Sequence, residues 1–145
     1  MPETANERIR VDAAPARCYE VAIDFEKYSE WARDVKSVTV LARDEQGRGT
    51  EVEYRAAAIG KSITYTLAYD YTDAPGSFSW TLVTGDMLRQ LDGSYRFEAD
   101  GDGTRVHYHL TVDLSAPLPG FVKRRAAGMI MGTALKELKR EVERR

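Results

Sequence analysis

Tyrosines and one arginine are the residues of this chain whose type and spacing suggest chemistry. The 145 residues include eight tyrosines, and several of them alternate with other residues along strand-like segments. A phenol contributes apolar area and one hydroxyl that needs a partner when it is buried. Arg89 alternates with Met87 and Leu91. If that face is buried, Arg89 needs an anionic partner such as a ligand carboxylate or enolate, or a protein carboxylate. The pattern favours a wall that binds aromatic or polyketide-like molecules.

Both observations have a simpler interpretation. The tyrosine rings could fill the core, with hydroxyls at the rim or bonded to backbone. Arg89 could lie at the sheet edge with its charged head in water. The sequence leaves these alternatives open.

The histidines and two acidic residues give no catalytic or metal site. His107 and His109 alternate with Val106 and its apolar neighbours, which predicts an outer-face position. Their spacing is compatible with metal binding, but no further ligand set lies nearby, so we expect no metal and no cofactor. Asp24 and Glu26 are predicted to cap helices or face solvent rather than act as an acid/base pair. Catalytic residues therefore stay unassigned.

Composition favours one soluble globular domain over residues 1–145, with 43% hydrophobic and 30% charged residues. The single Cys18 excludes an intramolecular disulfide and fits a reducing cytoplasm. The first ten residues do not resemble a secretory signal, and no uncharged run approaches the roughly 20 residues that span a bilayer. The pI of about 5.7 argues against nucleic acid as a partner.

Charge is distributed unevenly. Residues 123–145 hold eight Lys or Arg and three Glu, a net charge of +5, whereas the whole chain carries −2. This basic segment could steer an anionic lipid or partner, or it could be a solvated helix face that complements the helix dipole. Lys123, Arg124 and Arg125 follow two prolines and allow weak contact with a membrane surface. The sequence does not identify a protein partner.

The order of elements follows from the apolar periodicity. A strand is predicted at residues 9–13, a short helix at 16–24 after Pro15, and a helical turn at 28–31. Strand-like alternation follows at residues 38–40, 52–58, 63–71, 78–82, 87–97 and 106–114, and a long helix at 121–143.

Two uncharged stretches indicate how these elements pack. Phe78, Trp80 and Leu82 alternate like a strand with one buried face, and residues 126–135 carry no charge. A long helix is therefore predicted to be gripped by a curved antiparallel sheet, an α+β arrangement that tends to leave an interior space for a ligand.

The order and the residues together resemble the START-like, or helix-grip, superfamily. The likeness is greatest to the bacterial polyketide cyclase/dehydrase group, which also includes coenzyme Q-binding proteins of the Coq10-like group. The segments that carry the resemblance are AAP (13–15), DFEKYSEW (24–31), FSWTL (78–82), GTRV (103–106) and LPGFVKRRA (118–126).

The resemblance implies a seven-stranded antiparallel sheet wrapped round the C-terminal helix, with two small helices after the first strand and a cavity between helix and sheet. In relatives the aromatic residue at the position of Trp31 plugs the end of the grip. Strand parity then gives the predicted ligand-binding residues: Tyr54, Tyr65, Tyr69, Phe78, Trp80, Met87, Arg89, Tyr95 and Tyr108 from the sheet, with Phe121, Arg125 and Met129 from the helix. Gly128 and Gly132 are expected to leave room.

Three functions are compatible with this fold. The first is binding or transport of a hydrophobic small molecule, such as a lipid, an isoprenoid or quinone, or a polyketide-like compound. The second is a cyclase or aromatase acting on a polyketide-like substrate, with Arg89, Tyr95 and the other inward tyrosines as the only nominees for its acid or base. The third is a ligand-free protein-interaction or chaperone-like module. We favour the first.

Overall fold

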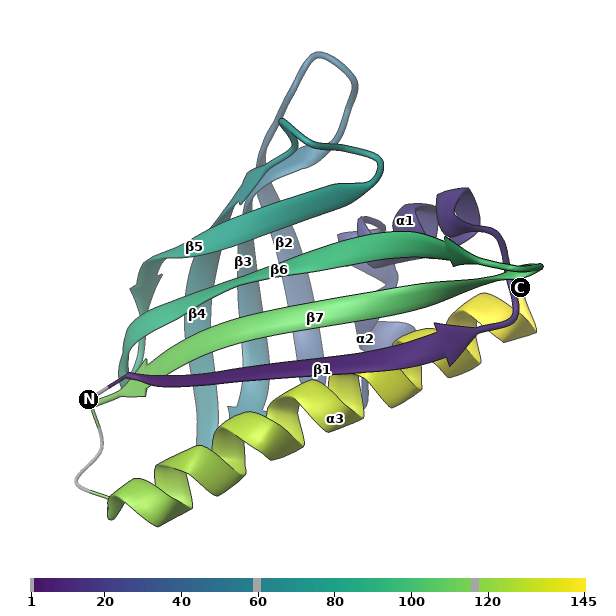
Figure 1. Cartoon of the computed structure of the whole chain (residues 1–145). Coiled ribbons are helices and arrows are strands. Elements are labelled where there is room, and N and C mark those ends of the chain that lie inside the picture. Colours follow the sequence, from purple (N-terminus) through teal and green to yellow (C-terminus); the bar gives the residue numbers. More distant parts are fainter. Residues whose placement is uncertain (1, 59–60, 116–117) are drawn as a thin grey trace.

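The computed structural model describes residues 2–58, 61–115 and 118–145, with the side chains of 58, 126, 127 and 129–131 outside the description. Over these residues the chain forms seven strands, three α-helices and one 3-10 helix (Figure 1). Their order is β1 (Glu3–Val11), α1 (Pro15–Ala22), η1 (Phe25–Lys27), α2 (Tyr28–Trp31), β2 (Val35–Arg43), β3 (Gly49–Ala58), β4 (Lys61–Asp70), β5 (Ser77–Gly85), β6 (Leu88–Asp100), β7 (Gly103–Leu114) and α3 (Gly120–Arg144).

The strands form one antiparallel sheet in the order β1-β7-β6-β5-β4-β3-β2. Strands β2 to β7 follow one another as a meander, and β1 pairs with β7 at the far edge. The sheet curves, and α3 runs along its inner side (Figure 1). The predicted α+β helix-grip architecture is confirmed, including the two short helical segments α1 and α2 after the first strand.

The first strand is longer than its apolar pattern indicated. It was predicted at residues 9–13, but β1 begins at Glu3 and ends at Val11. The whole strand pairs with β7, from Glu3 opposite Val112 to Val11 opposite Thr104. Much of this edge strand is exposed and polar, so hydrophobic alternation alone does not detect it. The short η1 was also not predicted.

The described buried side chains of helix α3 lie in its C-terminal half. Leu135, Leu138 and Val142 are buried, at a spacing that places them on one helix face. The helix packs against β1, with further contacts to β7 and α1. Burial of this stripe fixes the helix on the inner side of the sheet.

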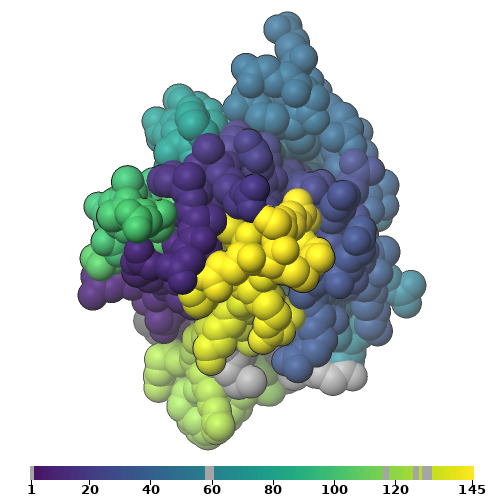
Figure 2. Space-filling model, turned by 90° about the vertical axis from the view of Figure 1, so that its right-hand side faces the viewer, coloured from purple at the N-terminus to yellow at the C-terminus, as the bar shows by residue number. Residues whose placement is uncertain are grey.

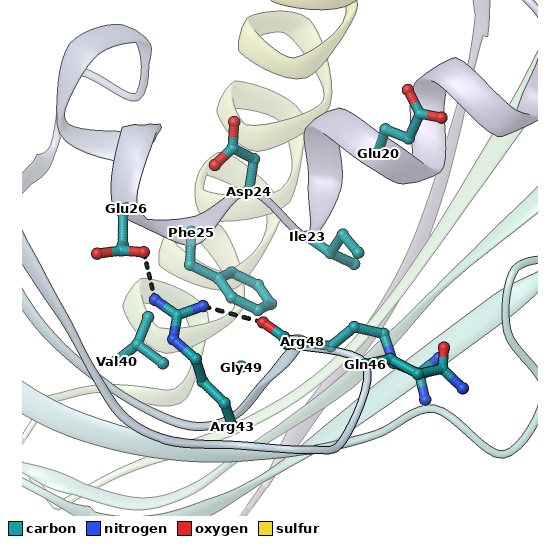
Figure 3. Close-up of a pocket in the computed structure, with 11 residues that line it drawn as sticks. Glu20, Ile23, Asp24, Phe25, Glu26, Val40, Arg43, Gln46, Arg48 and Gly49 are labelled. Carbon is teal, nitrogen blue, oxygen red and sulfur yellow. Dashed lines mark hydrogen bonds and ion pairs between the residues drawn. The ribbon is translucent and has the colours of Figure 1, made fainter.

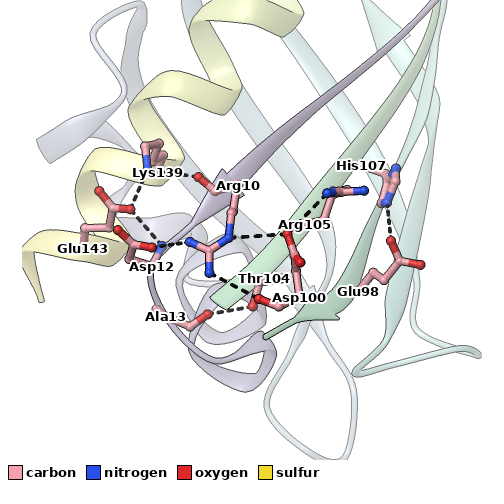
Figure 4. Close-up of polar contacts among 10 residues, drawn as sticks. All are labelled: Arg10, Asp12, Ala13, Glu98, Asp100, Thr104, Arg105, His107, Lys139 and Glu143. Carbon is pink, nitrogen blue, oxygen red and sulfur yellow. Dashed lines mark hydrogen bonds and ion pairs between the residues drawn. The ribbon is translucent and has the colours of Figure 1, made fainter. Parts of the chain in front are cut away.

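Polar contacts also hold the end of α3 against the start of the chain. The Lys139 ammonium donates to the Arg10 carbonyl oxygen at 2.9 Å, and the Asp12 backbone N–H donates to Glu143 Oε2 at 2.8 Å (Figure 4). Lys139 Nζ also lies 2.6 Å from Glu143 Oε2. Figure 2 shows this end of α3, in yellow, beside the purple N-terminal segment and the blue segments that follow.

Candidate functional site

Aromatic side chains from five adjacent strands form a continuous inner surface, which we call the aromatic wall. Cross-strand register pairs Tyr54 with Tyr65, Tyr69 with Trp80, Phe78 with Tyr95, and Tyr95 with Tyr108. Side chains directly opposite each other in a sheet lie on the same face and in contact. The ring centroids of these four pairs are 5.3, 6.0, 5.5 and 4.7 Å apart. The structure therefore brings together seven of the twelve predicted ligand-binding residues.

Several tyrosine hydroxyls are bonded within the protein. The hydroxyls of Tyr54 and Tyr69 lie 2.5 Å apart, and Tyr71 donates to the Gly49 carbonyl oxygen at 2.6 Å. Tyr28 donates to the Ala22 carbonyl oxygen. For these four residues the core-filling interpretation is sufficient, since their polar groups are satisfied.

Three other tyrosine hydroxyls of the aromatic wall form no such hydrogen bond to a described residue. Among the described residues, the hydroxyls of Tyr65, Tyr95 and Tyr108 have no hydrogen-bond partner. Tyr95 and Tyr108 each keep 8% of their surface accessible, and Tyr65 is partly buried. Among the described residues, these three hydroxyls therefore contribute no hydrogen bond to the fold.

The wall tyrosines are neutral at physiological pH. Burial raises the pKa of Tyr95 and of Tyr108 well above the usual value, and it raises the pKa of Tyr65 to about 12. A protonated phenol donates a hydrogen bond to a carbonyl or hydroxyl oxygen, but it does not take a proton from carbon. The chemistry of the wall is thus that of a set of neutral donors.

Two glycines on α3 leave room on the helix side. Gly128 and Gly132 are one helical turn apart and partly buried. A Cβ placed on either would meet no described atom within 4 Å, apart from its own helix backbone and chain neighbours. Met129, between them, lies outside the described side chains, so its predicted ligand contact stays a prediction.

Met87 and Arg89 do not join the aromatic wall. Met87 has a positive φ of 59° in the turn between β5 and β6. The register between β6 and β7 then shifts between Leu88 and Gln90. This irregularity interrupts the alternation on which the inward assignment rested, and the Arg89 side chain is exposed. The charged head of Arg89 therefore lies in water, the second of the two positions considered from the sequence.

Phe121 and Arg125 lie on exposed surface at the start of α3, and Phe121 is 66% exposed. The described buried residues of this helix all lie in its C-terminal half, where β1, β7 and α1 pack. The structure does not bring Phe121 or Arg125 to the aromatic wall, and their role as ligand contacts stays a prediction.

A separate hollow of about 280 Å³ lies between the segment from α1 to η1 and the hairpin that joins β2 to β3 (Figure 3). Phe25 lines it and also packs near Tyr69, with centroids 4.4 Å apart, so its ring stands between this hollow and the aromatic wall. Arg43 pairs with Glu26, and Arg48 Nε lies 2.8 Å from Asp44 Oδ2. Because its guanidinium groups are already paired, we assign no ligand to it. No sequence pattern indicated this hollow, which depends on how the hairpin packs.

The histidines lie on the sheet face opposite the aromatic wall. His107 Nε2 lies 3.2 Å from Glu98 Oε1, and His109 Nδ1 lies 2.7 Å from Asn6 Oδ1. In the described part of the chain, no group of three His, Cys, Asp or Glu side chains could hold a metal ion. None of the described helices is long and apolar enough to cross a membrane.

Solved structures share this fold over nearly the whole chain. A START superfamily protein from Mycobacterium smegmatis is 24% identical, with a TM-score of 0.90 and 97% of each chain covered. A protein from Thermus thermophilus is 26% identical, with a TM-score of 0.80 and 96% of each chain covered. The Zhui aromatase/cyclase from Streptomyces sp. R1128 is 16% identical, with a TM-score of 0.86 over 100% of this chain and 96% of that one.

Comparison of the sequence with known proteins agrees with the fold. None of the curated proteins matches the chain. Residues 2–143, almost the entire sequence, match one family. This family and fold indicate hydrophobic ligand binding or polyketide cyclase-type activity. The chain belongs to the family of polyketide cyclase/dehydrase and lipid transport proteins.

Proposed function

We propose that this protein binds a neutral, hydrophobic small molecule that carries carbonyl or hydroxyl oxygens, in the interior between the aromatic wall and α3. A quinone or other isoprenoid, a polyketide-like compound or an uncharged lipid has this chemistry. The observation that carries the proposal is the set of three protonated phenols, Tyr65, Tyr95 and Tyr108. Their hydroxyls have no partner in the described part of the chain, and they lie within a surface otherwise made of aromatic rings.

We infer that the ligand carries oxygen acceptors, because a phenol without a hydrogen-bond partner is energetically unfavourable in the interior. A phenol hydroxyl that is shielded from water and has no hydrogen-bond partner lowers the stability of the protein by about 1–3 kcal/mol. A ligand oxygen that accepts from Tyr95 or Tyr108 removes that cost, whereas a pure hydrocarbon adds to it. The aromatic rings around them supply apolar contact area for the rest of the molecule.

We infer that the ligand is uncharged, because the arginines predicted to lie near it are not in the interior. Arg89 and Arg125, the two cations predicted to line the interior, are exposed. A carboxylate placed against the aromatic wall would lose its hydration without gaining either guanidinium as a partner. The proposal is therefore an uncharged ligand rather than a free fatty acid.

The protonated state of these tyrosines favours a binding function over a catalytic one. Cyclisation of a poly-β-ketone needs a base that removes a proton next to a carbonyl. Tyrosines whose pKa is raised by burial hold their protons at neutral pH. They suit the polarisation or orientation of a carbonyl, which a carrier also requires.

We propose that residues 1–145 act as one helix-grip domain, with no nucleic acid partner. The single cysteine, Cys18, is buried and free, which supports a cytoplasmic location.

The experiment compares three probes by isothermal titration calorimetry: 2-methyl-1,4-naphthoquinone, 2-methylnaphthalene and 2-naphthoate. They share one ring system and differ in oxygen content and charge. We expect the quinone to bind most tightly and the carboxylate most weakly. Absence of binding by all three, together with turnover of a poly-β-ketone substrate, would instead establish the cyclase alternative.

A further inference from the structure

The outer face of the sheet, opposite the aromatic wall, carries a row of cations. The register places Arg8 of β1 opposite His107 of β7, and His107 opposite Arg96 of β6. Neighbouring strands are about 4.8 Å apart, so three cationic or titratable side chains stand side by side across three strands. Like charges directly opposite each other in a sheet are destabilising unless an anion lies between them.

The adjacent row shows how the fold neutralises such a pair. Arg10 lies directly opposite Arg105 across the same two strands. The Asp100 carboxylate stands between them, with Oδ2 at 3.4 Å from both Arg10 Nε and Arg105 Nη2 (Figure 4). Here the protein supplies its own anion.

The row of Arg8 has no equivalent carboxylate at its β1 end. Among the described residues, Arg8 forms no ion pair or side-chain hydrogen bond. At the β6 end of the row, the Glu98 carboxylate neutralises the charge: Oε1 lies 3.2 Å from His107 Nε2, and Oε2 lies 3.6 Å from Arg96 Nη1. An anion from outside the chain would complete this row as Asp100 completes its neighbour.

A hollow of about 600 Å³ lies over this row, and Arg8, Arg96, His107 and His109 line it. Its other lining residues are Asn6, Glu7, Ser77, Ser94 and Tyr108. Alternation along the strands directs the side chains of Glu7 and Tyr108 to the opposite face. The Ser94 hydroxyl, next to His109 in the register, has no partner among the described residues.

We propose that this hollow binds the phosphate group of a small phosphate monoester, independently of the ligand in the interior. Arg8 and Arg96 approach from opposite sides of β7, about 10 Å apart at their backbones. A phosphate presents oxygens in several directions and can accept from both guanidinium groups at once, whereas a carboxylate presents two oxygens in one plane. The histidines and the Ser94 hydroxyl offer further donors.

The two histidines of the chain both line the hollow, so their ring protons report on it directly by NMR. Phenyl phosphate is the probe, titrated at constant ionic strength, with phenyl sulfate as the singly charged comparison. We expect the ring-proton signals of both histidines to shift and to reach saturation as phenyl phosphate is added. Arg8→Gln and Arg96→Gln should weaken binding at least fivefold, because each removes a charge-assisted contact.

Arg55→Gln is the matched control, since Arg55 is an exposed arginine on β3, outside the hollow. It should bind phenyl phosphate as the wild type does, and thermal unfolding should show that all three variants keep the fold. Shifts that do not saturate, equal binding of phenyl sulfate, or the same loss in Arg55→Gln as in Arg8→Gln would each overturn the proposal. None of these outcomes depends on the interior ligand.

Discussion

Individual tyrosines of the aromatic wall differ in what their hydroxyls contact, and this difference separates structural from ligand-binding roles. The Tyr71 hydroxyl donates to the Gly49 carbonyl oxygen, whereas those of Tyr95 and Tyr108 have no partner among the described residues. Such hydroxyls contribute no hydrogen bond to the described fold and can donate one to a ligand.

Replacement of Tyr95 or Tyr108 by Phe therefore tests this role. Each change should weaken binding of the naphthoquinone by roughly three- to tenfold, the equivalent of one hydrogen bond. The free energy of unfolding should stay the same or rise, because no hydrogen bond to a described residue is lost and a shielded hydroxyl without a partner is removed. Calorimetry and urea unfolding measure the two effects.

The control for this prediction is Tyr71→Phe, which leaves the Gly49 carbonyl oxygen without its donor. It should cost about 1 kcal/mol of stability and leave quinone affinity unchanged. If Tyr95→Phe and Tyr108→Phe destabilise the fold as Tyr71→Phe does, their hydroxyls have protein partners and the assignment is incorrect.

Buried tyrosines also make the fold sensitive to alkali. The pKa of Tyr65 is raised by burial to about 12 in the folded state, and an unfolded tyrosine ionises near pH 10. Folding therefore favours the protonated form: its contribution to stability is complete below about pH 10 and is lost as the pH rises toward 12. Urea unfolding across this pH range should show that decline, with tyrosinate absorbance from the wall appearing only as the protein unfolds. Complete ionisation near pH 10 in a folded protein would contradict the burial of these phenols.

Strand β6 makes room for part of the aromatic wall, because one of its residues is a glycine. Gly93 lies opposite Trp80 in the register. A Cβ on Gly93 would stand 2.5 Å from Trp80 Cζ2 and 2.6 Å from the His109 carbonyl oxygen. Only glycine lets the indole approach this strand so closely.

Gly93→Ala should thus displace Trp80 and lower stability by about 1–3 kcal/mol, as overpacking does. Gly76→Ala is the comparison, since a Cβ there would meet only the Asp73 carbonyl oxygen at 3.7 Å, and it should be nearly neutral. Chemical denaturation together with tryptophan fluorescence measures both. Equal stability of the two variants would show that the close approach of Trp80 to β6 is absent.

Gly132 of α3 offers a test of where the ligand binds that does not remove a side chain. Gly132→Leu adds a side chain where no described atom lies within 4 Å and improves helix propensity by roughly 1 kcal/mol. We expect stability to be kept or raised and quinone binding to be reduced at least tenfold. Leu138→Ala, which truncates a residue only 1% exposed, should instead cost about 2–5 kcal/mol. Unchanged quinone affinity in Gly132→Leu would place the ligand elsewhere.

At the scale of the whole molecule, hydrophobic periodicity together with the resemblance to helix-grip proteins predicted the architecture, but not the full length of β1. Alternation in β3 to β7 and the uncharged stretch of α3 predicted a sheet that grips a helix, and seven wall residues followed from the same parity. The register shift after Met87 could not be predicted, because one irregular residue changes the face of those near it. The hydroxyl partners and the Arg8 row depend on register between distant strands, which no single segment encodes.

The central claim is that the interior holds an uncharged, oxygen-bearing hydrophobic molecule. Native mass spectrometry of the freshly purified protein, followed by organic extraction and identification of the bound compound, tests it most directly. We predict one such molecule per chain in the wild type and none in Gly132→Leu. An anionic lipid extracted in equal amount from both proteins, or a ligand-free wild type that also fails to bind the naphthoquinone, would contradict the account.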